Sequence, residues 1–219
     1  MNQRDSDSSR SVENPQNAGG DVRTEATCQE GEQRAQRLNA RLRAIRNVNQ
    51  LIAREKDRDR LLQGTCARLS EVGGYPGCWI VLLDESRMPT HTAEAGMGEA
   101  LGCLTDRIRR GESNHCAPRA LSQTGSVVVE DPASACGDCP LLPRCAGHRT
   151  MAARLAYGEK VFGLMGVSLS GDCTVESEEL ALFEEVASDV AFALHSLRLE
   201  EERQRAQRAL LLEQSRLEA

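Results

Sequence analysis

The sequence predicts an α+β domain in which helices flank an antiparallel β-sheet and a long helix extends from each end. Short apolar runs bounded by turn residues, such as 78–83, alternate with amphipathic helical segments in the middle of the chain. Both ends instead carry mixed charges around thin apolar stripes, a pattern typical of exposed helices. The predicted parts are a disordered tail (1–30), an N-terminal coiled-coil helix (31–56), a central domain (57–199) and a C-terminal helical arm (200–219).

Composition narrows the class of protein. The 219 residues include 33 acidic and 27 basic side chains, and the net charge of −6 argues against nucleic acid as a partner. No stretch approaches the ~20 apolar residues of a membrane span, so we expect a cytoplasmic protein without a membrane partner. Aromatic residues make up 3 % of the chain, which predicts an aliphatic core.

The N-terminal helix carries a short seam with the alternating spacing of a coiled coil. Its members are Leu38, Leu42, Ile45, Asn49 and Ile52. Asn49 in such a seam would fix register at a cost in stability. We therefore predict a homodimer joined through helical arms. The alternative is a single amphipathic helix that lies on its own domain.

The central elements follow from periodicity and turn signals. We predict a helix ended by Gly73 and Gly74, a close backbone approach or bulges at Gly163 and Gly166, and a hairpin turn at 158–159. The predicted elements are strands at 78–83, 91–95, 126–130, 150–157 and 160–168, and helices at 98–110, at 117–122 and from about residue 175.

Three cysteines lie within the ten residues 136–145. Their spacing is C-x2-C-x5-C, with Cys136, Cys139 and Cys145, and Cys116 lies upstream. The thiols of a C-x-x-C turn can point to one side, where they bind one metal ion or close a disulfide. The chain has nine cysteines. We expect Cys66 and Cys78 to be small core residues.

The order of these elements resembles the GAF domain, a sensing and ligand-binding fold related to PAS. The segments that carry the resemblance are Cys116–Leu121, Gly125–Pro132, Lys160–Val167 and Phe183–Ala191. The likeness is to GAF modules of bacterial and archaeal sensor histidine kinases, some of which carry Cys-x-x-Cys-Pro in the same loop. The resemblance implies that flanking helices relay signals to a histidine kinase or another effector. The chain lacks kinase nucleotide-binding motifs, and His195 is its only helical candidate for a phospho-acceptor.

The cysteines allow several hypotheses. Cys116, Cys136, Cys139 and Cys145 could hold zinc or an iron–sulfur cluster, with His148 or His115 as substitute ligands. Haem, bound in some kinase GAF domains, is a further option.

Without metal, the Cys136–Cys139 pair could act as a thiol switch, which Arg144 would favour by stabilising thiolate. Free methionine-(R)-sulfoxide reductases are GAF-fold enzymes with cysteine pairs, which offers an enzymatic alternative for Cys116 with Cys139 or Cys145. The cysteines could also be unligated beside a small-molecule pocket. We predict a cytoplasmic GAF sensory module, not an enzyme, that detects redox state, oxygen or a metal through its cysteine loop.

Overall fold

The computed structural model describes residues 18–112, 116–170, 175 and 177–217, with side chains described between residues 31 and 216. It divides into two compact units, residues 1–37 and 38–219, which are described separately. In the first unit, helix α1 (Ala18–Ile52) begins inside the segment predicted to be disordered, and its residues 31–37 are exposed. The rest of that predicted tail, residues 1–17, lies outside the described residues.

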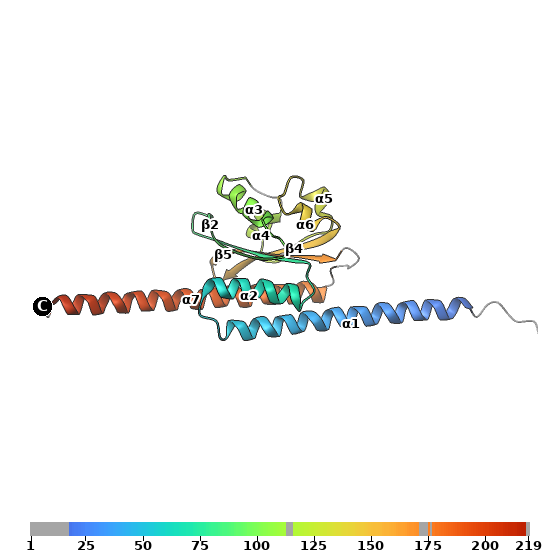
Figure 1. The fold of residues 1–219 in the computed structure, drawn as a ribbon, viewed down its shortest axis with the longest axis horizontal. Helices are drawn as coiled ribbons and strands as arrows, with labels where there is room; N and C mark the ends of the chain where they lie inside the picture. Colours follow the sequence, from blue (N-terminus) through green and yellow to red (C-terminus); the bar gives the residue numbers. More distant parts are fainter. Residues whose placement is uncertain (1–17, 113–115, 171–174, 176, 218–219) are drawn as a thin grey trace, which may run out of the picture. The chain divides into compact units, whose positions relative to one another are not determined.

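The second unit is built on a five-stranded sheet with the strand order β2-β1-β5-β4-β3 (Figure 1). All neighbouring strands are antiparallel, and β4 turns into β5 at Gly158, whose φ is 60°. The predicted α+β fold with an antiparallel sheet is therefore confirmed. The strands are β1 (Gly77–Leu83), β2 (Pro89–Ala95), β3 (Val127–Val129), β4 (His148–Tyr157) and β5 (Lys160–Ser170).

One face of the sheet packs against helix α2 (Arg58–Glu71), helix α7 (Ser177–Leu217) and the end of α1. Successive side chains of a strand point to opposite faces, so alternate residues of β1 enter this core. Cys78 is one of them, and Cys66 of α2 belongs to the same core. Both are fully buried, as expected for small core residues. Asp57 caps α2 by accepting a hydrogen bond from the Arg60 N–H at 2.9 Å.

The end of α1 packs on the domain of its own chain. Ala44, Ile45 and Val48 are buried in the core that α2, α7 and the sheet share. Leu42 and Asn49 of the predicted seam are exposed. Ile45 therefore fits the alternative prediction, an amphipathic helix that lies on its own domain, because the domain of the same chain buries its side chain. A coiled coil between two copies remains a prediction.

Helix α7 changes character along its length. Phe183, Val186, Val190 and Leu194 are buried against the sheet, so the first part of the helix has an apolar face. From Glu202 to Arg216 every described side chain is exposed, and Figure 1 shows this part extending past the sheet. The helix thus continues as an arm to Leu217.

The opposite face of the sheet carries four shorter helices and a second core (Figure 1). They are α3 (Ala100–Arg109), α4 (Cys116–Ser122), α5 (Pro132–Ala135) and α6 (Leu142–Cys145). The last two lie where the sequence predicts a loop. Pro132 and Pro143 occupy their first turns, where a backbone without an N–H loses no helical hydrogen bond. Among the residues that the structure describes, no helix is both long and apolar enough to cross a membrane.

Candidate functional site

Four cysteines from two segments come together on the second face of the sheet. Cys116 is the first residue of α4, and Cys145 is the last residue of α6. Cys136 is the C-cap residue of α5, and its carbonyl accepts a hydrogen bond from the Cys139 N–H at 2.9 Å. Gly137, with φ of 50°, closes the tight turn between these two residues.

The four thiols line one small cavity of about 30 Å³. Cys136, Cys139 and Cys145 are 9 %, 7 % and 6 % exposed, and Cys116 is half-buried. All four are present as thiols, without disulfides. The structure thus brings together the four residues that the sequence nominated from separate segments. The remaining walls are Trp79, Pro132, Leu141, Leu142, Thr150, Met151 and Ala152.

Trp79 forms the wall of this cavity on the side of β1. Its partner across the sheet is Gly166 of β5. A Cβ atom on Gly166 would lie inside the contact distance of the Trp79 indole ring. The neighbour that Gly166 accommodates is therefore a side chain and not the backbone expected from sequence. The expected close backbone approach is found at Gly163, where an added Cβ atom would meet the Val81 carbonyl beside a register shift in the β4–β5 pairing.

The thiols change one another's pKa values. A hydrogen bond with Cys116 lowers the pKa of Cys136 to about 7, although burial opposes this change. The same bond, together with burial, holds the pKa of Cys116 far above its usual range. Burial, with the nearby Cys139, raises the pKa of Cys145 to about 12. Cys136 is therefore the group most ready to become a thiolate, the form that binds metals and attacks oxidants.

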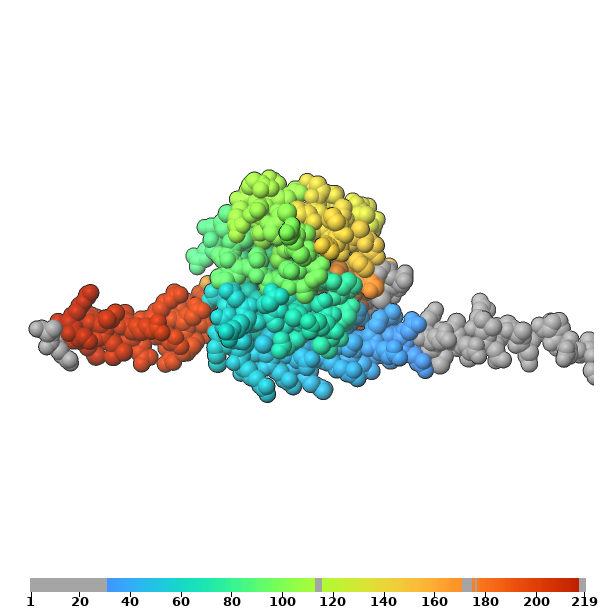
Figure 2. Space-filling model, in the orientation of Figure 1, coloured from blue at the N-terminus to red at the C-terminus, as the bar shows by residue number. Residues whose placement is uncertain are grey.

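An arginine of α3 holds the cysteine turn in place. The Arg107 guanidinium donates to the Asp138 carbonyl at 2.7 Å and to the Asp138 carboxylate at 2.8 Å. It also pairs with Glu112 at 3.1 Å. In Figure 2 the yellow segment that contains this turn lies directly beside the green segment that contains α3. Sequence reasoning missed Arg107, because nothing in its local pattern indicates a partner in the cysteine turn 31 residues away.

The cluster has the donor set of a thiolate metal site, but its atoms are not arranged as in a formed centre. Across the described residues, no three Cys, His, Asp or Glu side chains are positioned to hold a metal ion. The substitute ligand His148 begins β4 and does not line the cavity, although its Nδ1 is buried without a hydrogen-bond partner. The other suggested substitute, His115, lies outside the described residues. Ligation by the cysteines remains a prediction.

The other residues considered from sequence lie away from the cavity. Arg144, expected to favour thiolate, is in α6, and its guanidinium lies near Gly98. His195 packs against the rings of Tyr157 and Phe162, with centroids 4.8 Å and 6.4 Å away. Cys103 is exposed on α3.

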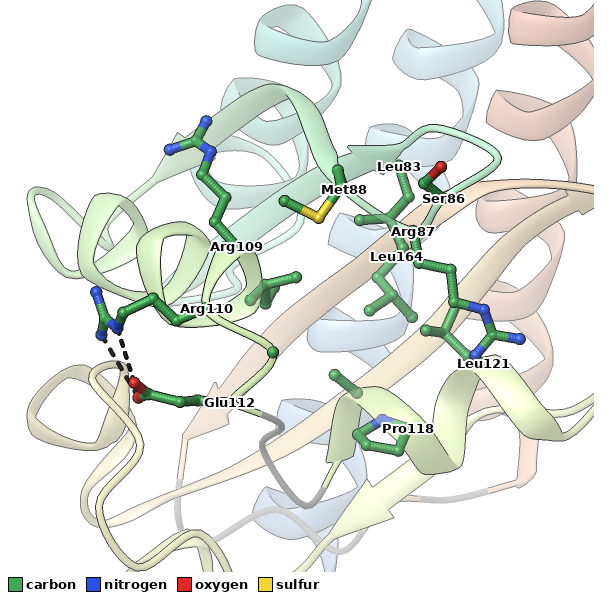
Figure 3. Close-up of a pocket in the computed structure, with 13 residues that line it drawn as sticks. Leu83, Ser86, Arg87, Met88, Arg109, Arg110, Glu112, Pro118, Leu121 and Leu164 are labelled. Atoms are coloured by element: carbon green, nitrogen blue, oxygen red, sulfur yellow. Dashed lines mark hydrogen bonds and ion pairs between the residues drawn. The ribbon is translucent and has the colours of Figure 1, made fainter.

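A larger cavity of about 430 Å³ lies on the same side of the sheet, between the β1–β2 turn, the end of α3 and helix α4 (Figure 3). Its walls are largely apolar, and Leu164 of β5 forms part of the floor. Arg87, Arg109 and Arg110 lie around it. No motif in the sequence predicted this cavity, because its walls come from four separate elements.

The sequence and the fold define the class of protein. Residues 55–195 match the GAF domain family, and the chain belongs to that family. GAF domains serve as ligand-binding folds in sensor proteins. No curated protein sequence matches the chain.

Solved structures share the fold at low sequence identity. The GAF domain of a phosphoenolpyruvate-protein phosphotransferase from Coxiella burnetii is 14 % identical, with a TM-score of 0.56 over 75 % of this chain and 98 % of that chain. Free methionine-R-sulfoxide reductase from Neisseria meningitidis is 15 % identical, with a TM-score of 0.55 over 72 % and 89 %. The GAF domain of a protein described as a sensor histidine kinase from Pseudomonas syringae pv. tomato is 16 % identical, with a TM-score of 0.51 over 80 % and 98 %.

Proposed function

We propose that this GAF domain is a cytoplasmic sensor that detects redox state or a bound metal through Cys116, Cys136, Cys139 and Cys145. The observation that carries the proposal is the convergence of these four thiols, from two segments, on one small cavity. Four thiolates in one place suit tetrahedral zinc or an iron–sulfur cluster. The reducing cytoplasm keeps such thiols available.

The size of the cavity favours a single ion over a cluster in the present arrangement. A volume of about 30 Å³ corresponds to roughly one water molecule. A metal ion would supply a positive centre that holds four thiolates together. Metal binding requires the cysteine turn to shift, because the four thiols are not yet positioned as metal ligands. An iron–sulfur cluster would require the turn to open. Either change gives the domain two states that differ in the position of the turn.

Strand β4 connects the cavity to the output helix. Its residues 150–152 line the cavity, and Met151 also belongs to the core that contains α7. The Glu184 carboxylate of α7 accepts a hydrogen bond at 2.8 Å from the Ser126 N–H, just before β3. Movement of the cysteine turn therefore acts on elements that contact α7. A coupling of about 1–3 kcal/mol between site and helix would suffice for signalling.

The arm of α7 is the proposed route to a partner. Leu199, Leu210, Leu211 and Leu212 are exposed by 48 %, 61 %, 56 % and 67 %. Exposed leucines on a charged helix favour a second helix as their cover. We propose a homodimer joined through these arms that passes the signal to a histidine kinase or another effector.

The test is anaerobic purification followed by an absorption spectrum and analysis for zinc, iron and sulfide. About one zinc per chain without colour supports a single-ion site, and a broad visible band with iron and sulfide supports a cluster. Cys136→Ser and Cys145→Ser should each release the metal. The matched control is Cys103→Ser, which removes an exposed thiol of α3 outside the cavity.

Metal-free protein is tested further by titrating its thiols before and after mild oxidation with peroxide. Loss of two thiols in the wild type, but not in Cys136→Ser, supports redox switching. Protein that contains no metal and loses no thiol overturns both forms of the proposal. Turnover of free methionine-(R)-sulfoxide by the same preparation would instead make the chain an enzyme.

A further inference from the structure

The 430 Å³ cavity between α3, α4 and the β1–β2 turn has a largely apolar interior, and Arg87, a residue with a positive φ, lies at its edge. Its volume lies within the ~300–1,000 Å³ range of small-molecule sites. Leu83, Ile108, Leu121 and Leu164 supply apolar walls from four elements. Such a surface binds the apolar part of a ligand, and the charged groups at its edge decide which ligand.

The three arginines around the cavity differ in what they already contact. Arg109 pairs with Asp106 at 2.8 Å, and Arg110 pairs with Glu112 at 2.7 Å. Figure 3 shows the Arg109 side chain pointing away from the cavity and Arg110 held by Glu112 at its outer side. Arg87 lines the cavity on the side opposite to Arg109 and Arg110 (Figure 3). Among the described carboxylates, none pairs with Arg87.

The backbone at Arg87 is strained. Its φ is 62°, the only positive φ of a non-glycine residue within the part of the chain that the structure describes. The turn around it is closed by hydrogen bonds from the Asp84 N–H to the Met88 carbonyl and from the Met88 N–H to the Asp84 carboxylate, at 2.9 Å and 2.8 Å. Glycine would fit this position without strain. The sequence instead places a long cation there, at the edge of the cavity.

We propose that this cavity binds a small amphipathic anion, with one carboxylate or similar group on Arg87 and an unbranched or ring-shaped apolar body against the leucines. A guanidinium binds a carboxylate especially well, because it can donate two parallel, charge-assisted hydrogen bonds to the two carboxylate oxygens. The apolar walls exclude a strongly charged ligand such as a nucleoside triphosphate, because its remaining charges would meet no partner.

This site does not rest on the proposed cysteine function. No cysteine lines the cavity, and its wall on α4 is made of Ala117, Pro118 and Leu121, beyond Cys116. Binding at this cavity should therefore persist in the Cys136→Ser variant. An experiment on ligand binding at this cavity therefore gives a clear result whether or not the cysteines bind a metal.

The test is calorimetric titration of the full chain with octanoate, with octanamide as the neutral analogue and octylammonium as the cationic one. Octanoate should bind at least about tenfold more tightly than octanamide, a factor that one charge-assisted contact accounts for. Octylammonium should not bind. Equal affinity for octanoate and octanamide would overturn the assignment of an anion, and no binding of any of the three would overturn the site.

Arg87→Gly separates binding from folding. The variant should keep or raise the unfolding temperature, since glycine relieves the positive φ, while octanoate affinity falls about tenfold to the level of octanamide. Arg109→Gln is the matched control, because it removes the same charge from a side chain that points away, and affinity should change less than about twofold. Loss of affinity in both variants to the same degree would show a general charge effect and overturn the role of Arg87.

Discussion

A buried ion pair joins the two helices that enter and leave the domain, and it provides the sharpest stability prediction. The Arg41 guanidinium of α1 lies 2.7 Å from the Glu179 carboxylate in the first turn of α7. The two side chains are 9 % and 6 % exposed. Arg41 also lies over the Tyr75 ring, 5.1 Å from its centroid, and burial raises the pKa of the Tyr75 hydroxyl above its usual range.

The expected loss in free energy of unfolding is large because both side chains of the pair are buried. Removing one member of a buried ion pair leaves an uncompensated charge, which costs about 3–5 kcal/mol. Arg41→Met should therefore lower the free energy of unfolding by about that amount, and Glu179→Leu should do the same. The double variant removes both charges and keeps the volume, so it should lie within about 1–2 kcal/mol of the wild type.

The assay is urea unfolding, followed by the fluorescence of Trp79 and by far-ultraviolet circular dichroism. Trp79 is the single tryptophan of the chain and is 6 % exposed, so its signal reports the core. Arg203→Met is the control. It breaks the exposed pair with Glu200, in which the two side chains are 67 % and 45 % exposed, and should leave the urea midpoint essentially unchanged.

Two results would refute this reasoning. A loss below about 1 kcal/mol for Arg41→Met would mean that water reaches the pair in solution. A double variant whose loss equals the sum of the two single losses would mean that the two side chains stabilise the fold independently, through packing or the Tyr75 contact, and not through their mutual charge.

Three further predictions concern the cysteine site. Gly166→Ala should lower the free energy of unfolding by about 1–3 kcal/mol and shift Trp79 fluorescence, because the added methyl group displaces the indole ring. Arg107→Ala releases the turn that carries Asp138, so iodoacetamide should alkylate Cys139 faster, as measured by mass spectrometry of peptides. In metal-free protein, the alkylation rate of Cys136 should rise with pH around an inflection near 7, because only the thiolate reacts and hydrogen bonding from Cys116 stabilises it.

Each of these has its own control. Gly102→Ala on α3, where nothing lies within 4 Å of the added atom, should stabilise the protein by about 0.5–1 kcal/mol. A Gly166→Ala variant as stable as that control would show that Trp79 is not tightly held. Unchanged Cys139 alkylation in Arg107→Ala would show that the turn keeps its position without the arginine. Cys116→Ala should move the Cys136 inflection upward, and an unmoved inflection would contradict the hydrogen bond.

Much of the fold was predictable because its signals are local. Alternating apolar residues and the Gly158 turn identify the β4–β5 hairpin, since a strand period of two needs no knowledge of distant partners. The cysteine spacing identified the stretch 136–145 for the same reason. The seam of α1 shows the limit of such patterns. A stripe with Ile45 predicts that something covers the residue, but not that the cover is its own domain.

The sequence by itself determined that this chain is a GAF-like α+β domain with sulfur-rich chemistry in one loop. Only the tertiary structure decided that Cys116 meets the loop, that Arg107 holds the turn, and that Arg87 stands beside an apolar cavity. The physical reason is that the residues of each site lie far apart in the sequence. Hydrogen-bonding and apolar periodicity act between neighbours in the chain, whereas a site is made by side chains that the sheet and its helices bring together from far apart.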